Sequence, residues 1–172
     1  MPNFLNRLLA ESESGIVFHK PNVAFDIEKA YRQFKRIFVE CDYMHHRHGV
    51  AITMALLKTE ESIPSLDIKK LIRLTDRHIE IDETHHTILF TFTNVDNAYR
   101  AILRIEKSLY TQFATKDVFD FSCVIAEKQK GETLYTLFKK VAIALFEIEK
   151  EIVIIDPCSK KNISFNITHT QH

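Results

Sequence analysis

The segment from Arg73 to Phe92 constrains the fold of this chain more than any other. Its sequence passes from the end of an expected helix into two short apolar segments separated by a polar turn. The second segment, Thr87 to Phe92, is β-branched or apolar throughout, which favours a buried strand. The turn consists of five polar residues, namely Asp82, Glu83, Thr84, His85 and His86. The pattern predicts a β-hairpin around which the rest of the chain completes a sheet.

Apolar periodicity predicts the elements on either side of this hairpin. Four helices are expected, over residues 24–41, 66–74, 95–110 and 133–150, with Asn94 as an N-cap. Five strands are expected, over residues 50–57, 78–81, 87–92, 118–126 and 152–155. The run from Val50 to Leu57 is almost continuously apolar, the pattern of a central strand buried on both faces. This order predicts an α+β fold, an α/β sandwich with a ferredoxin-like βαββαβ palm and a mostly antiparallel sheet flanked by helices.

Length and composition suit one globular domain. The 172 residues suffice for one hydrophobic core. We expect a lead-in helix and linker over residues 1–20, a domain over 21–157, and a polar tail or edge hairpin over 158–172. Basic and acidic residues number 23 each, so the chain carries no overall charge for binding nucleic acid. No apolar run has the length of a membrane span and no signal peptide is evident, so we expect a cytoplasmic protein without membrane insertion.

The scarcity of glycine and cysteine excludes two further kinds of site. Only three glycines occur, too few for a glycine-rich phosphate loop. Three cysteines lie far apart, which does not suit a disulfide framework, and we expect small buried residues at Cys41, Cys123 and Cys158.

Two groups of side chains admit both a structural and a functional interpretation. Histidines cluster at positions 45, 46 and 48 and again at 85 and 86. Imidazoles could bind zinc or copper. Because no carboxylate or cysteine recurs at ligand spacing, we instead expect solvated loop histidines and no metal. An aromatic stripe with near-helical spacing comprises Phe25, Tyr31, Phe34 and Phe38. It predicts core packing, or alternatively a dimer seam continued by the lead-in helix.

Several short strings, in this order, resemble a GGDEF domain, the family of bacterial diguanylate cyclases. The segment Pro21 to Phe25 is similar to the P-N-R-x-x-F motif that opens the first helix of the family, and Val141 to Phe146 resembles its A-D-x-A-L-Y motif, with Ala142 in place of the Asp. Further similar positions are Ile88-Leu89, Thr93–Asp96, Ala98–Leu109 and Ser122. The resemblance covers roughly Phe18 to Asp156 and rests on order and spacing.

The resemblance also implies that cyclase activity is absent. The signature turn G-G-D-E-F falls on Asp82 to His86, and all five positions differ. A second metal-binding acid is expected near Leu57 to Thr59, where no Asp occurs, and the segment between that strand and Arg73 is too short for the helix that binds guanine and phosphate. Magnesium on a triphosphate needs convergent oxygen ligands. We therefore expect a degenerate domain that is not an enzyme and holds no cofactor.

One motif of the family is retained. Arg73 and Asp76 form an R-x-x-D motif five residues before the signature turn, as in cyclases inhibited by cyclic di-GMP, and Arg104 matches a second arginine on the following helix. At a helix end, Arg73 and Asp76 would project from one face as a cation–carboxylate pair. The resemblance implies that the three bind cyclic di-GMP and that ligand binding promotes a dimer. The alternative is a protein-interaction scaffold without a nucleotide ligand, which binds a protein partner or a second copy.

Overall fold

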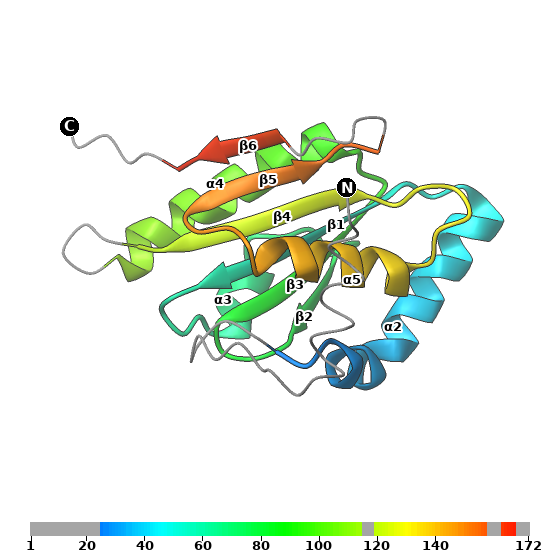
Figure 1. Ribbon diagram of the computed structural model, residues 1–172, viewed down its shortest axis with the longest axis horizontal. Coiled ribbons are helices and arrows are strands. Elements are labelled where there is room, and N and C mark those ends of the chain that lie inside the picture. Colours follow the sequence, from blue (N-terminus) through cyan, green and yellow to red (C-terminus); the bar gives the residue numbers. More distant parts are fainter. Residues whose placement is uncertain (1–24, 115–118, 158–162, 168–172) are drawn as a thin grey trace.

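A six-stranded sheet with helices on both faces forms the part of the chain described by the computed structural model, residues 25–114, 119–157 and 163–167 (Figure 1). The strands are β1 (Ile52–Thr59), β2 (Arg77–Glu80), β3 (His85–Thr91), β4 (Phe121–Glu127), β5 (Glu151–Ile155) and β6 (Ile163–Asn166). The helices are α2 (Ile27–His48), α3 (Ser65–Lys69), α4 (Val95–Phe113) and α5 (Leu134–Leu145). The expected lead-in helix and Cys158 lie outside the described residues.

The strand order is β2-β3-β1-β4-β5-β6. Strand β1 lies in the interior and pairs antiparallel with β3 and β4, with Ile52 opposite Thr91 and Met54 opposite Ala126. Strands β2, β3, β1 and β4, together with helices α3 and α4, complete the predicted βαββαβ palm. Strand β5 joins β4 in parallel after the crossover through α5, and β6 pairs antiparallel with β5. The predicted fold class is confirmed.

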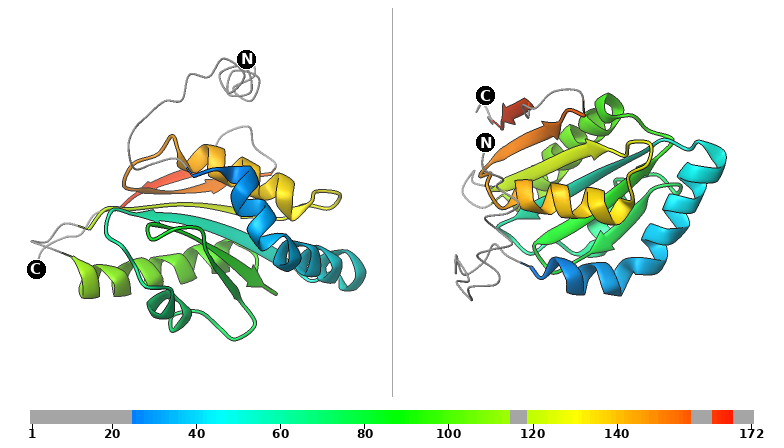
Figure 2. Two further views of the ribbon diagram at one scale, coloured as in Figure 1. Left: turned by 90° about the horizontal axis from the view of Figure 1, so that it is seen from below. Right: turned by 45° about the vertical axis from the view of Figure 1, so that its right-hand side comes forward.

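Each face of the sheet packs against its own pair of helices. Because successive strand residues point to opposite faces, Met54 and Leu56 enter the core beneath α2 and α5, whereas Ala55 and Leu57 enter the core beneath α3 and α4. Figure 2 (left) shows the two helix layers on either side of the sheet. Because β1 is buried on both faces, almost all of its residues are apolar, which confirms the prediction of a central strand.

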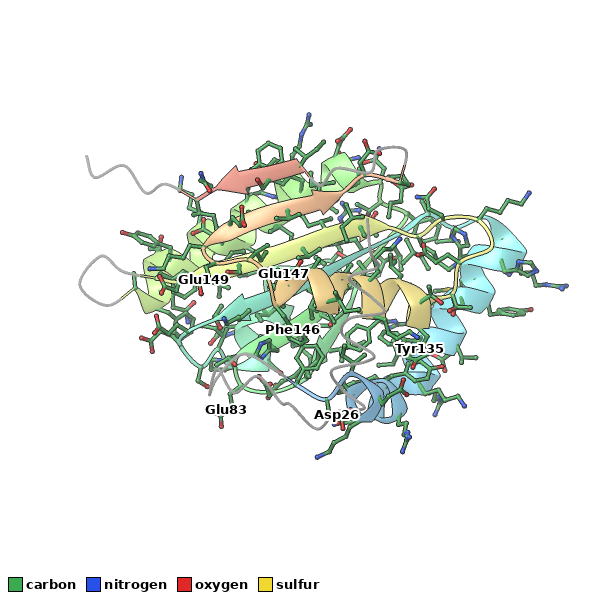
Figure 3. All side chains as sticks on the ribbon, in the orientation of Figure 1. Asp26, Glu83, Tyr135, Phe146, Glu147 and Glu149 are labelled. Carbon is green, nitrogen blue, oxygen red and sulfur yellow. The ribbon has the colours of Figure 1, made fainter. Side chains whose placement is uncertain are left out.

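The aromatic stripe of α2 packs into the core beneath α5. The rings of Phe38 and Phe138 lie 5.4 Å apart, and those of Tyr31 and Tyr135 lie 4.2 Å apart. Figure 3 shows Tyr135 at the end of α5 beside α2, with Phe146 at the other end. The core-packing interpretation of the stripe is therefore confirmed.

The ends of several elements differ from the prediction. Helix α2 continues to His48 instead of ending near residue 41. In the added part of the helix, the Asp42 carboxylate accepts the Leu134 N–H at 3.0 Å and ties α2 to the start of α5. The helix ends at Gly49, whose left-handed φ of 64° suits a C-cap. The predicted tail contains strand β6, so the edge-hairpin alternative applies to residues 163–166.

Other predictions for single elements are corrected or confirmed by the structure. Helix α3 ends at Lys69 rather than at 74, and α5 ends at Leu145 rather than at 150. Asn94 caps α4 as predicted, since its side chain accepts the Asn97 N–H at 3.0 Å. Cys41 and Cys123 are buried, also as predicted, and burial raises the pKa of both thiols. Among the described helices, none combines the length and apolar character needed to cross a membrane.

Candidate functional site

The R-x-x-D motif forms a tight turn, not the end of a helix. The Asp76 N–H donates to the Arg73 carbonyl at 3.1 Å, and the Arg73 N–H donates back to Asp76 Oδ2 at 3.1 Å. Helix α3 has already ended at Lys69. The predicted helical pair of Arg73 and Asp76 side chains is therefore wrong, since within the described residues the carboxylate binds backbone N–H groups instead of the guanidinium. We call residues 73–76 the Arg73 turn.

Asp76 also attaches the Arg73 turn to the sheet. Its Oδ1 accepts the Thr91 N–H at 3.2 Å, and the Thr91 hydroxyl donates to the Thr75 carbonyl at 2.8 Å. Asp76 is buried, at 7% exposure. Carboxylate oxygens that accept backbone N–H groups make stronger hydrogen bonds than neutral acceptors. The backbone of Arg73 is therefore held from both sides while its side chain is exposed.

Arg104 lies on α4 and is exposed as well. Helices α3 and α4 cover the same face of the sheet (Figure 2). The Arg73 turn follows α3 along the chain, and Arg104 belongs to α4. The segments 65–73 and 95–113 carry six basic residues and three acidic ones, although the whole chain is neutral. The basic members besides the two arginines are Lys69, Lys70, Arg100 and Lys107.

These additional cations were not identified from the sequence. Arg100, Arg104 and Lys107 follow one another at spacings of four and three residues, and all three are exposed. On a helix this spacing places them along one stripe. Charge periodicity on the expected helix, rather than motif matching, is the signal that identifies them.

A pocket of about 720 Å³ lies at the opposite end of the sheet from the Arg73 turn. It is formed by the ends of β1 and β4, the turn between β2 and β3 (residues 81–84, the hairpin turn) and the connection from α5 to β5. Polar side chains line it, including Lys58, Thr59, Asp82, Thr84, Asp120 and Lys150. Lys150 has a left-handed φ of 56° and binds Asp120 at 2.7 Å, so this wall of the pocket is occupied by an ion pair.

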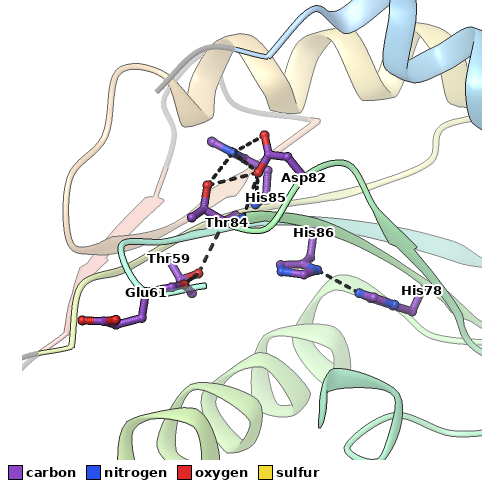
Figure 4. A network of polar contacts seen from close by, with 7 residues as sticks. All are labelled: Thr59, Glu61, His78, Asp82, Thr84, His85 and His86. Atoms are coloured by element: carbon purple, nitrogen blue, oxygen red, sulfur yellow. Dashed lines mark hydrogen bonds and ion pairs between the residues drawn. The ribbon is translucent and has the colours of Figure 1, made fainter. Parts of the chain in front are cut away.

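The hairpin turn is organised by Asp82. Its Oδ1 accepts the N–H groups of Thr84 at 2.9 Å and His85 at 2.8 Å, and it also contacts His85 Nδ1 at 2.9 Å (Figure 4). Burial alone would raise the pKa of the Asp82 carboxyl, but the hydrogen bonds from Thr84 and His85 together hold this pKa below its usual value. Three of the five residues that the sequence resemblance aligned with the signature turn, Asp82, Thr84 and His85, therefore form hydrogen bonds within the turn.

His85 and His86 are buried residues of β3 and not solvated loop residues, which corrects the prediction. His85 pairs with Lys58 of β1, and its ring packs edge-on against Phe25 at 5.2 Å. His86 lies on the opposite face of the sheet, where its Nδ1 is 3.1 Å from His78 Nε2 (Figure 4). Burial lowers the pKa of each ring to about 4; His86 reinforces the effect on His78, and His85 reinforces the effect on His86. Both rings are therefore neutral at pH 7.

The other histidine cluster lies in the last turn of α2, where His45 Nδ1 contacts the Val50 carbonyl at 2.8 Å. Within the described ranges, no three His, Cys, Asp or Glu side chains converge in a way that could hold a metal ion.

Comparison with solved structures shows a similar fold in two GGDEF domains and a diguanylate cyclase. The GGDEF domain of DgcB from Caulobacter crescentus, in complex with c-di-GMP, has a TM-score of 0.58 at 12% identity, over 67% of this chain and 81% of its own. Diguanylate cyclase SiaD from Pseudomonas aeruginosa, in complex with its activator SiaC, has a TM-score of 0.59 at 16% identity, over 88% of this chain and 66% of its own. The FimX GGDEF domain from Pseudomonas aeruginosa has a TM-score of 0.53 at 12% identity, over 67% of this chain and 85% of its own.

No protein-family model and no curated protein matches the sequence. The likeness in structure nevertheless confirms that the chain has the fold of a GGDEF domain, as the resemblance in sequence implied.

Proposed function

We propose that this chain is a catalytically inactive GGDEF-like signalling domain that binds cyclic di-GMP through Arg73, Asp76 and Arg104. The observation that supports it best is the Arg73 turn, which holds the backbone of Arg73 at two points and leaves the side chain exposed on the same face as Arg104. Asp76 acts here mainly by positioning Arg73, because backbone N–H groups occupy both of its oxygens.

The charge of this face suits a ligand with two phosphates. Guanidinium groups bind phosphates and guanine edges with paired hydrogen bonds, and each such contact is worth about 1–3 kcal/mol. The basic residues around Arg73 and Arg104 add a favourable field for a dianion. The DgcB domain, which shares the fold, was solved with c-di-GMP bound.

The pocket at the hairpin turn supports the loss of catalysis. At the positions expected for the metal-binding acids of the family, this pocket presents Thr84, Lys58 and Thr59, and Asp82 stands where a glycine is expected. A lysine ammonium repels magnesium, and a threonine hydroxyl is a weaker ligand for it than a carboxylate. Incubation with GTP and magnesium or manganese should therefore give no cyclic di-GMP, and clear turnover would contradict the inactivity.

Calorimetric titration with cyclic di-GMP tests the binding site. Arg73→Ala and Arg104→Ala should each weaken binding by roughly ten- to a hundredfold, the equivalent of one lost bidentate contact. Arg36→Ala is the matched control, because Arg36 is 90% exposed on α2, on the other face of the sheet, and should bind like wild type. Absence of binding by the wild-type chain would overturn the proposal.

The alternative function is a protein-interaction module without a nucleotide ligand. A shallow groove of about 420 Å³ on α2 supports it, lined by Val39, Tyr43, Met44 and Arg77. Val39 and Tyr43 are 52% and 57% exposed, which is unusual for large apolar side chains on one helix. Sedimentation of the chain with and without cyclic di-GMP separates the two functions. Dimerisation that requires the ligand supports the first, and ligand-independent self-association without binding supports the second.

A further inference from the structure

Two large apolar side chains are exposed beside the Arg73 turn. Leu74, at the tip of the turn, is fully exposed, and Phe92, the residue after β3, is 68% exposed. The sequence pattern had predicted that Phe92 belongs to a buried strand, and the structure corrects this. Exposed aromatic rings of this kind commonly mark places where a ligand or partner binds.

Hydrogen bonds between the Arg73 turn and the end of β3 bring the segments of Leu74 and Phe92 together. In the β2–β3 ladder, Arg77 lies opposite Leu89, and beyond this pair the Thr91 N–H still donates to Asp76 Oδ1 at 3.2 Å. The hydrogen bond from the Thr91 hydroxyl to the Thr75 carbonyl, at 2.8 Å, shows that the two chains still run side by side at this level. Arg73 precedes Leu74, so a cation and an aromatic ring lie at the same corner of the sheet.

The backbone of Phe92 is held in an unfavourable conformation. Its φ is 54°, in the left-handed region that a bulky residue rarely adopts. Hydrogen bonds fix the residues on both sides of it. Thr93 Oγ1 donates to the Thr91 carbonyl at 2.8 Å, and Thr53 Oγ1 donates to the Thr93 carbonyl at 2.7 Å. The ring is thus held out of the core by a rigid connection, and backbone strain of this kind is often found at functional sites.

We propose that Phe92, with Leu74 beside it, forms a shelf on which a purine base of the bound nucleotide stacks. This inference rests on the proposed function and adds the element that recognises the base. The guanidinium of Arg73 then binds the phosphate or the edge of the base while Phe92 covers its face. Apolar and aromatic surfaces bind the faces of bases, and arginine binds their edges and charges.

The first experiment is a titration of Phe92→Leu with cyclic di-GMP. Leucine keeps an apolar side chain but removes the aromatic face, and binding should weaken roughly fivefold to a hundredfold, the range expected for one lost base–aromatic stack. Tyr43→Leu is the matched control, because Tyr43 is a similarly exposed aromatic residue on α2, which packs on the other face of the sheet. Its affinity should equal that of wild type.

The second experiment uses the absence of tryptophan from the sequence. Phe92→Trp introduces a single fluorescent reporter, and a guanine stacked on its indole should quench the emission as the site fills. Tyr43→Trp places the same reporter on α2, where the ligand should leave the emission unchanged. This measurement depends on the reporter and not on a change in affinity, so it holds even where Phe92→Leu alters the fold.

The outcomes separate the shelf from the proposed function. If wild type binds and Arg73→Ala weakens binding, but Phe92→Leu binds normally and Phe92→Trp is not quenched, the shelf is wrong and the proposed function stands. If wild type does not bind, both fail. If Phe92→Leu leaves ligand affinity intact and instead abolishes self-association, the exposed pair is a protein contact, which also overturns the shelf.

Discussion

Replacing Asp76 with alanine removes the carboxylate that closes the Arg73 turn and ties it to β3. The Arg73 N–H and the Thr91 N–H then lose their acceptor. A hydrogen bond to a charged group contributes about 1.5–3 kcal/mol, but water can replace the carboxylate at the exposed Arg73. Thr91 is only 2% exposed, so its N–H remains largely without a partner. The free energy of unfolding should therefore fall by about 3 kcal/mol.

Urea unfolding followed by circular dichroism at pH 7 measures this change, and thermal unfolding should show a Tm lower by about 6–12 °C for a chain of this size. Asp76→Asn keeps one carbonyl oxygen and should lose about half as much. Arg73→Ala is the comparison that separates the two halves of the motif. Its stability should stay within about 0.5 kcal/mol of wild type, because an exposed side chain is removed.

Two results would refute this assignment of roles. A loss below about 1 kcal/mol for Asp76→Ala would mean that the carboxylate does not hold the turn. An equally large loss for Arg73→Ala would mean that the two side chains stabilise the fold as an ion pair, as the sequence had suggested.

Three further predictions concern other parts of the molecule. His78 and His86 have pKa values of about 4 in the fold and about 6.5 when unfolded, so the unfolded state binds more protons between these values and stability falls as the pH falls through that window. Urea unfolding at pH 5 should show about 2 kcal/mol less stability than at pH 7, a value discounted because His78 is only partly buried. His78→Gln should reduce this difference. Asp42→Ala should lower the free energy of unfolding by about 3 kcal/mol, because it leaves the buried Lys128 without its partner. In the wild-type chain the Lys128 ammonium lies 3.7 Å from the Asp42 carboxylate. A loss below about 1 kcal/mol would show that this pair does not stabilise the fold. Phe92→Gly should leave stability unchanged or raise it by up to about 1 kcal/mol, since glycine accepts a φ of 54°, and a clear loss would show that the ring contributes to packing.

The sequence by itself determined the kind and order of the elements. Strand β1 was recognisable because burial on both faces demands apolar residues at every position, and α4 because its N-cap and apolar stripe agree. These signals are local, since each is carried by consecutive residues or by residues one helical turn apart. The βαββαβ order follows from them, and the fold class was predictable for that reason.

The roles of single side chains depended on contacts between distant segments. A spacing of three residues brings side chains together on a helix, but it also joins the two ends of a tight turn, so the R-x-x-D pattern alone does not distinguish an ion pair from a turn closed by Asp76. The polar character of His85 and His86 predicted a turn. In the structure they pair with Lys58 and Leu57 of β1, so they are buried strand residues.

The same reason explains the extension of α2 and the exposure of Phe92. Asp42, expected in a turn, lies in the helix, and its carboxylate binds the start of α5, which lies 92 residues further along the chain. Phe92 continues an apolar strand pattern, but the hydrogen bonds around Thr93 turn its backbone to a left-handed φ and expose its ring. Only the assembled sheet brings this ring to the Arg73 turn, because the β2–β3 register and not the distance along the chain makes the two segments neighbours.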